Sequence, residues 1–157
     1  MSNFIIMSDQ EQQAFSVDLA EITSLLFANC NDKESRHAAK YGLSAVEFRC
    51  IRKLFEKGQL TVNHMAQELS LTSSRVTRII DGLVEKKLVN RVSGKNDRRV
   101  FNLSLTPKGE KLAQDSIKDH IKIHEEIIKN IPEQYHQSMI EILKRLNEAV
   151  KNWLEKY

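Results

Sequence analysis

Residues 60–83 have the sequence LTVNHMAQELSLTSSRVTRIIDGL, and this stretch decides the fold. It holds two successive groups of apolar residues, each at the spacing of three and four that is typical of an amphipathic helix. Thr61 precedes the first group and Thr72 the second, so each hydroxyl is placed to cap a helix. The first helix is predicted to end at about Leu69 and the second at about Lys87. So brief a connection between two short helices indicates a helix-turn-helix.

The apolar period changes to two after the second helix. Residues 88–92 and 99–105 alternate in the manner of β-strands. Between them, residues 93–97 have the sequence SGKND, in which Gly, Asn and Asp favour turn dihedrals. These segments predict a β-hairpin with a basic tip.

Further helices are predicted on both sides of this region. A polar group at 31–33 is expected to interrupt the first helix. The sequence SAVE at 44–47 is a capping box, in which Ser and Glu satisfy free amides of the first helical turn. The predicted helices run from Asp9 to Asn29, through a short piece ending near Gly42, from Ser44 to Gly58, from Thr106 to about Asn130 and from Pro132 almost to the last residue.

The expected fold is mainly α with a small β-hairpin wing (α+β): a winged helix-turn-helix with N- and C-terminal dimerisation helices. The last helix is strongly apolar and has no evident partner within so small a domain. Burial of its apolar face favours pairing with the first helix and with a second copy of the chain. We therefore expect residues 1–43 to serve dimerisation and connection, 44–106 to form the winged helix-turn-helix domain and 107–157 to form two further dimerisation helices.

The charge distribution points to a polyanionic partner. The net charge is only +3, but residues 72–99 hold eight Lys or Arg against three Asp or Glu, an excess of five positive charges. No apolar run approaches the roughly 18 residues of a membrane helix, and the N-terminus lacks the features of a secretion signal. A cytoplasmic protein without a membrane partner is expected. Its two cysteines form no disulfide framework.

The second helix of the helix-turn-helix is predicted to contact DNA. With its apolar residues facing inward, its other face presents small hydroxyl side chains and arginines, which suit base edges because arginine donates two hydrogen bonds to guanine. The residues expected to bind DNA from this recognition helix are Ser73, Ser74, Arg75, Thr77 and Arg78. The hairpin adds Lys95, Arg98 and Arg99, with Asp97 close enough to orient a guanidinium. Such a tip suits the narrow minor groove.

The sequence resembles the multiple-antibiotic-resistance regulator (MarR) family. The resemblance lies in residues 60–83, in Lys87-Leu88-Val89, in the wing motif Asp97-Arg98-Arg99 and in Leu105-Thr106-Pro107-Lys108-Gly109. It implies a homodimer built from the first and last helices, bound to a palindromic DNA operator through successive major grooves and flanking minor grooves. It also implies a repressor, less often an activator, that a small-molecule effector releases by changing the separation of the recognition helices.

The effector is left open by the sequence, and no cofactor is expected. His120 and His124 lie four residues apart on one helix face, as a zinc pair requires, and His37, Glu34 or Cys30 would have to complete such a site. Cys30 is also the candidate for a thiol-redox response, whereas Cys50 shares an apolar face and is expected in the core. For an organic effector, Arg49, Tyr41 and His37 are candidate lining residues.

Three other classes of protein fit the sequence less well than a specific DNA-binding regulator: an architectural DNA-binding protein, an enzyme and a helical adaptor. An architectural protein that coats DNA non-specifically would not need Ser, Thr and Arg on a reading face. An enzyme would need catalytic groups, and no phosphate-binding glycine loop, nucleophile elbow or paired-carboxylate motif is present. In a helical adaptor for another protein, the exposed basic hairpin would have no role.

Overall fold

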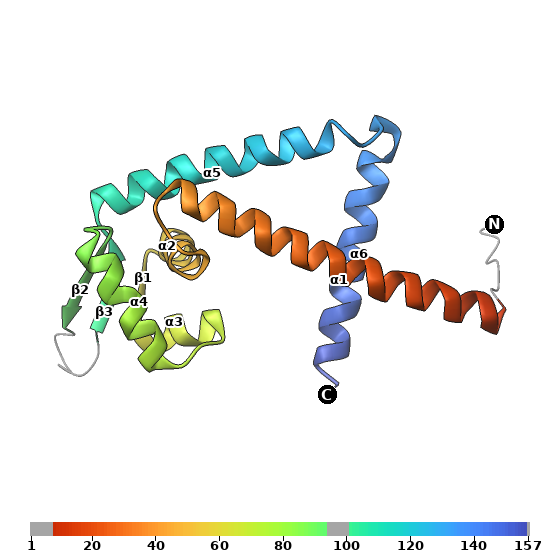
Figure 1. Cartoon of the computed structure of the whole chain (residues 1–157). Coiled ribbons are helices and arrows are strands. Elements are labelled where there is room, and N and C mark those ends of the chain that lie inside the picture. The colour runs from red at the N-terminus through yellow and green to blue at the C-terminus, as the bar shows by residue number, and fades with distance from the viewer. Residues whose placement is uncertain (1–7, 94–100, 157) are drawn as a thin grey trace. The chain divides into compact units, whose positions relative to one another are not determined.

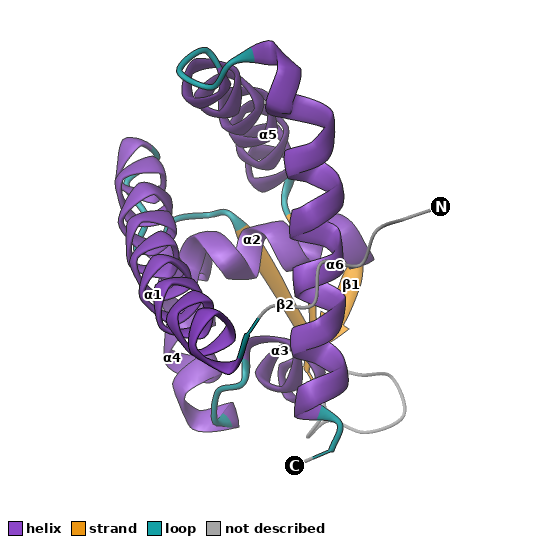
Figure 2. Ribbon diagram, turned by 90° about the vertical axis from the view of Figure 1, so that its right-hand side faces the viewer, coloured by secondary structure: helices purple, strands orange, loops and turns teal. Residues whose placement is uncertain are grey.

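The computed structural model describes residues 8–93 and 101–156 (Figure 1). Helices dominate it, and the strands form one small sheet (Figure 2). The chain divides into two compact units, the first ending at Ala113 and the second beginning at Gln114. In chain order the elements are α1 (Asp9–Lys40), α2 (Ala45–Lys57), β1 (Gln59–Thr61), α3 (Val62–Leu69), α4 (Ser73–Glu85), β2 (Val89–Ser93), β3 (Phe101–Leu105), α5 (Pro107–Ile128), the 3₁₀ turn η1 (Glu133–Tyr135) and α6 (His136–Leu154).

Helix α1 is a single uninterrupted helix, so the break predicted at 31–33 is wrong. Asn31 and Asp32 are exposed and Lys33 is half-buried, and Arg36 Nε donates to Asp32 Oδ2 at 2.8 Å across one turn. Such pairs stabilise a helix, and neither Gly nor Pro is present to end it. The helix instead ends just before Gly42, whose φ of 66° lies in the left-handed region.

Helix α2 begins at the predicted capping box. Glu47 N donates to Ser44 Oγ at 3.3 Å, and Ser44 N donates to Glu47 Oε2 at 2.8 Å. Gly58 ends the helix with a φ of 76°. The inward face includes Phe48, which was not predicted to be buried, while Phe55 is exposed.

The helix-turn-helix and the hairpin are confirmed. Thr61 Oγ1 caps α3 by accepting from His64 N, and Thr72 Oγ1 caps α4 by accepting from Arg75 N. The turn between the two helices contains Ser70 in the left-handed conformation. Helix α4 ends two residues earlier than predicted, because Lys87 adopts a left-handed φ of 61°.

The sheet contains a strand that sequence patterning missed. Its order is β1-β3-β2, and both pairings are antiparallel. Strand β1 is only three residues long, too short to show an alternation of its own. It places Leu60 opposite the buried Leu103 of β3. The sheet therefore holds both ends of the helix-turn-helix, because β1 precedes α3 and β2 follows α4.

One core orients the recognition helix. Val76, Ile80 and Leu83 of α4 are fully buried. They join a cluster that also holds Ala38, Leu43, Phe48, Cys50, Ile51, Leu54, Met65, Ala66, Leu88, Val89, Leu103 and Ala113. Burial of aliphatic side chains stabilises a fold by about 1.5–3 kcal/mol each. The orientation of α4 is therefore set by packing on one face, which leaves the opposite face free for contacts outside the chain.

A polar contact ties the end of α4 to the start of α2. Lys86 Nζ donates to Glu47 Oε1 at 2.8 Å and to the carbonyl of Gly42 at 3.1 Å. Partial burial of Glu47 raises its pKa, but the hydrogen bonds from Lys86 and Ser44 outweigh this effect and leave the pKa below its ordinary value of 4.5.

We expect Glu47→Gln to lower the free energy of unfolding by about 1–2 kcal/mol at neutral pH, because the variant loses both the charged cap and the pairing with Lys86. The pKa of Glu47 is lower in the folded than in the unfolded chain, so its stabilisation is present above pH 4.5 and is lost as the pH falls through the folded pKa. Urea titrations of both proteins at neutral and acidic pH check this. An equal difference at both pH values would contradict it.

The C-terminal helices depart from prediction at one point. Helix α5 begins at Pro107 as predicted, with Thr106 Oγ1 accepting from Gly109 N at 3.0 Å. Pro132 does not open the last helix. It is followed by the turn η1, and α6 begins only at His136. Pro fits the first helical turn, and here the turn that it starts is 3₁₀. Within the described residues, no helix is long and apolar enough to cross a membrane.

Candidate nucleic-acid interface

The exposed face of α4 carries two arginines. Ser74, Arg75 and Arg78 all lie on this face, opposite the buried Val76 and Ile80. Neither guanidinium forms an ion pair or hydrogen bond with another described residue. Ser74 Oγ lies 3.2 Å from Thr72 Oγ1, the hydroxyl that caps the helix. The amino-terminal half of α4 thus presents a small hydroxyl and two positive charges that no other described residue pairs with.

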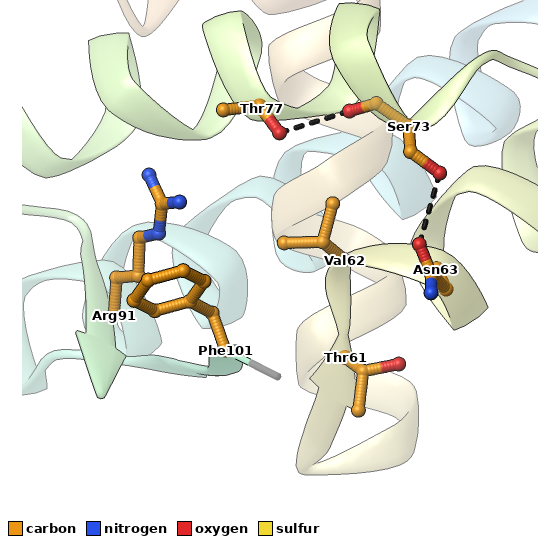
Figure 3. A pocket seen from close by; sticks show the side chains of 7 residues that line it. All are labelled: Thr61, Val62, Asn63, Ser73, Thr77, Arg91 and Phe101. Atoms are coloured by element: carbon orange, nitrogen blue, oxygen red, sulfur yellow. Dashed lines mark hydrogen bonds between the residues drawn. The ribbon is translucent and has the colours of Figure 1, made fainter. Parts of the chain in front are cut away.

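Two of the five predicted recognition-helix residues lie toward the rest of the domain (Figure 3). Ser73 Oγ donates to Asn63 Oδ1 of α3 at 2.9 Å, and Thr77 Oγ1 donates to the carbonyl of Ser73 at 2.9 Å. Ser73 therefore joins the two helices of the motif. Thr77 is half-buried beside it.

The far half of α4 meets the base of the wing. Arg91 of β2 places its Nη1 2.7 Å from Asp81 Oδ1 of α4. Its guanidinium carbon lies 4.0 Å from the centre of the Phe101 ring of β3, a cation–π contact (Figure 3). A pocket of about 260 Å³ lies between α3, α4 and the sheet. It is lined by Thr61, Val62, Asn63, Ser73, Thr77, Arg91 and Phe101.

The predicted wing residues Lys95, Asp97, Arg98 and Arg99 lie outside the described residues. The flanking strands are described, and they pair in register from Val89 opposite Leu105 to Ser93 opposite Phe101. Residues 94–100 therefore connect two paired antiparallel strands.

Sequence patterning missed Asn63, Asp81 and Arg91. A usable signal existed for Arg91: strand alternation places Arg91 on the same face as Val89, and Val89 is buried. An arginine on such a face needs a partner. The identity of that partner depends on how α4 crosses the sheet, which the sequence pattern does not give.

Comparison with known proteins agrees with this geometry. The model of the MarR family matches residues 43–101. The HTH-type transcriptional regulator MhqR of Bacillus subtilis is 30% identical over 141 residues, which cover 90% of this chain and 97% of MhqR.

The chain belongs to the MarR family.

As a member of that family it is a DNA-binding transcriptional regulator of the winged helix-turn-helix type. The transcriptional repressor MdtR of Bacillus subtilis is 31% identical over 85 residues, 54% of this chain and 55% of MdtR. Among solved structures, FabT of Streptococcus pneumoniae in complex with DNA matches with a TM-score of 0.73 and 25% identity over 88% of this chain and 99% of FabT. A MarR-family protein of Bacillus stearothermophilus, 19% identical, shares the fold with a TM-score of 0.79 over 93% of this chain and 99% of its own.

The candidate metal ligands of this MarR-family chain lie in both units. In the second unit, the rings of His120 and His124 lie 4.3 Å apart on α5, beside Ile121, Glu125 and Ile128. In the first, His37 is buried edge-on against Phe48 at 5.0 Å between ring centres. Among the described residues, no three His, Cys, Asp or Glu side chains gather as a metal site would require. Zinc binding stays a prediction, which metal analysis of protein purified without chelators tests.

The organic-effector candidates have clear structural positions. Tyr41 and His37 pack with Phe48 in an aromatic cluster, with Tyr41 stacked on Phe48 at 6.2 Å. Arg49 Nε lies 3.5 Å from Glu34 Oε2, which links α2 to α1. These positions leave the choice of an effector open.

The two cysteines differ in accessibility. Cys30 is exposed on α1, and Cys50 is fully buried in α2. Burial, together with the nearby charge of Glu47, raises the pKa of Cys50 to about 12. The core position predicted for Cys50 is confirmed. The redox role of Cys30 stays a prediction.

We expect Cys50 to resist a thiol reagent in the folded protein, because the thiolate is the reactive form and neither it nor solvent is available there. In Cys30→Ser, labelling is expected only after denaturant is added. The matched variant Cys50→Ser retains the exposed thiol and is expected to react without denaturant. Rapid labelling of native Cys30→Ser would contradict the buried position.

Proposed function

We propose that this MarR-family chain is a sequence-specific transcriptional repressor that binds a pseudo-palindromic operator as a homodimer and leaves it when an effector binds. The observation that supports it best is the pair Arg75 and Arg78, which form no ion pair with another described residue and lie on the exposed face of a helix whose other face is buried in the core. Arginine on such a helix suits guanine in the major groove.

The homodimer is supported by apolar side chains that are exposed among the described residues of each unit. In the first unit, α1 exposes Phe15, Ile22, Leu25, Leu26 and Phe27. In the second unit, α6 exposes Ile140, Ile142, Leu143, Val150, Trp153 and Leu154. Exposed apolar surface on this scale marks an interaction site. A second copy supplies the matching faces, since a twofold interface brings the same patch from each chain.

The dimer gives a physical basis for effector release. Two recognition helices that enter successive major grooves must lie about 34 Å apart, one turn of duplex. A ligand that binds more tightly to a dimer with another spacing lowers the affinity for DNA without touching it. The effector itself, whether organic ligand, zinc or oxidant, remains to be identified by release from DNA.

Binding to DNA tests this function. The probe is the intergenic DNA beside the protein's own coding sequence, with random duplex as competitor, measured by fluorescence anisotropy at fixed salt. We expect Arg78→Ala to weaken operator binding about 10-fold or more and to narrow the preference for operator over random DNA. Arg99→Ala is expected to weaken binding to both DNAs alike.

Arg52→Ala is the control, because Arg52 is an exposed arginine of α2 that pairs with Glu34 and Glu56. Unchanged affinity in both test variants would remove the assignments. Equal affinity of the wild type for operator and random DNA would instead identify an architectural protein. A monomer in sedimentation at binding concentrations would contradict the proposed operator geometry.

A further inference from the structure

The base of the wing is fastened to the recognition helix by one side chain. Arg91 lies on the inner face of the sheet, next to the pair formed by Ser93 and Phe101, and its own partner across the ladder is the buried Leu103. From there its guanidinium forms the ion pair with Asp81 and the contact with the Phe101 ring. A single group thus touches β3 and α4 while belonging to β2.

The contact is specific to arginine. A guanidinium is planar, so it stacks on a ring with one face while an edge nitrogen donates to a carboxylate. Only 25% of the Arg91 side chain is exposed, and its Nε is buried without a hydrogen-bond partner among the described residues. Burying the Nε donor without a hydrogen-bond partner costs free energy. The Nη1 atom of the same guanidinium meanwhile donates to Asp81 Oδ1.

We propose that Arg91 is a positioning residue that makes the wing and the recognition helix contact DNA as one unit. The inference rests on the proposed function, because it concerns how the two DNA contacts depend on each other. Since residues 94–100 join β2 to β3, holding the strands against Asp81 holds both ends of that connection. Without Arg91, each contact forms independently of the other.

A double-mutant cycle measures this dependence. We expect Arg91→Met to weaken operator binding about 10-fold. In the Arg91→Met background, the loss caused by Arg99→Ala is expected to fall below about 2-fold, because the wing is no longer held in register. The loss caused by Arg78→Ala is expected to persist, since α4 remains packed in the core. An undiminished effect of Arg99→Ala in that background overturns the proposal.

A second variant separates positioning from charge. Removing Arg91 also leaves Asp81 uncompensated beside the DNA-binding face. If Arg91→Met combined with Asp81→Asn regains wild-type affinity, the loss came from that carboxylate and the proposal is wrong. Asp81→Asn alone removes the ion pair through its more exposed partner, and is expected to weaken the effect of Arg99→Ala as well. Arg52→Met controls for the loss of one exposed arginine.

Amide hydrogen exchange in the DNA-free protein gives a readout that does not depend on the proposed function. Arg91→Met and Asp81→Asn are expected to raise exchange about 5-fold or more in β2 and β3 while exchange in α2 stays unchanged. Unchanged exchange in the strands overturns the proposal even if DNA binding is altered. Should Arg78→Ala and Arg99→Ala leave wild-type binding intact, the proposed function fails, and the exchange result still decides whether Arg91 joins the strands to α4.

Discussion

Replacing Gly109 with alanine is expected to lower the free energy of unfolding by about 3 kcal/mol, because the added methyl group has no room. Gly109 is in the first turn of α5, and a Cβ there would overlap the carbonyl oxygen of Leu88 and lie 3.3 Å from a methyl group of Leu105. The obstacle is backbone, so no side-chain rotation relieves it. Either the start of α5 or the segment before β2 has to move.

That segment cannot move cheaply. Thr106 N donates to the Leu88 carbonyl at 3.0 Å, and Thr106 Oγ1 donates to the carbonyl of Lys87 at 2.8 Å. Lys108 Nζ adds a bond to the carbonyl of Lys86 at 3.1 Å. The motif LTPKG at 105–109 thus links the start of α5 to residues 86–88, which follow the recognition helix. Its glycine permits the close approach of α5 to the Leu88 carbonyl.

Gly82→Ala is the matched control for Gly109→Ala. It is also a helical glycine, but a Cβ there meets only Glu47 Oε1, at an ordinary 3.5 Å. Because alanine favours helix over glycine by up to about 1 kcal/mol, this variant is expected to be neutral or slightly stabilised. Urea unfolding followed by circular dichroism, at one protein concentration, compares the two. Equal stability of both variants would show that α5 does not pack as described.

The second large effect is expected for Leu83→Ala, with a loss of about 2–5 kcal/mol. Leu83 is fully buried at the carboxyl end of α4, where its backbone carbonyl also accepts from Leu88 N at 2.9 Å. Leu83 belongs to the buried apolar cluster, so its truncation leaves a cavity that the close-packed residues around it fill only in part. Operator affinity is expected to fall with stability, because the direction of Arg78 depends on this packing.

Val84→Ala supplies the control for Leu83→Ala. Val84 is the next residue of the same helix and is 38% exposed. Its truncation is expected to change stability by less than about 1 kcal/mol. The same unfolding titration serves both variants. A larger loss at Val84 than at Leu83 would mean that the helix is rotated from the orientation described.

Sequence patterning recovered what depends on local chemistry. The caps at Ser44, Thr61 and Thr72 and the glycine at 58 gave the bounds of α2, α3 and the start of α4, because each acts within a few residues of itself. The change of period gave the hairpin. Membership of the MarR family followed from a motif that spans the same region.

Most of the misses depend on tertiary contacts. Strand β1 exists because β3 pairs with it. The break expected at 31–33 is the exception, because Arg36 pairs with Asp32 across one turn and no Gly or Pro ends the helix there. The hydrogen bond from Ser73 to Asn63 of the preceding helix was not predicted, and the DNA-binding role of Ser73 stays a prediction. The pairing of Asp81 with Arg91 depends on how α4 crosses the sheet. Apart from the break at 31–33, none of these features can be predicted from a local sequence pattern.

Strands β1 and β2 both pair with β3, so the segments before and after the helix-turn-helix are hydrogen-bonded to the same central strand. Neither α3 nor α4 can move far from the other without breaking the hydrogen bonds of β3 to β1 or β2. Any signal that redirects α4 must therefore carry α3 and the sheet with it as a block. The proposed effector response would then move α3, α4 and the sheet together, and sequence changes that tune it are expected in the segments that join them to the rest of the chain.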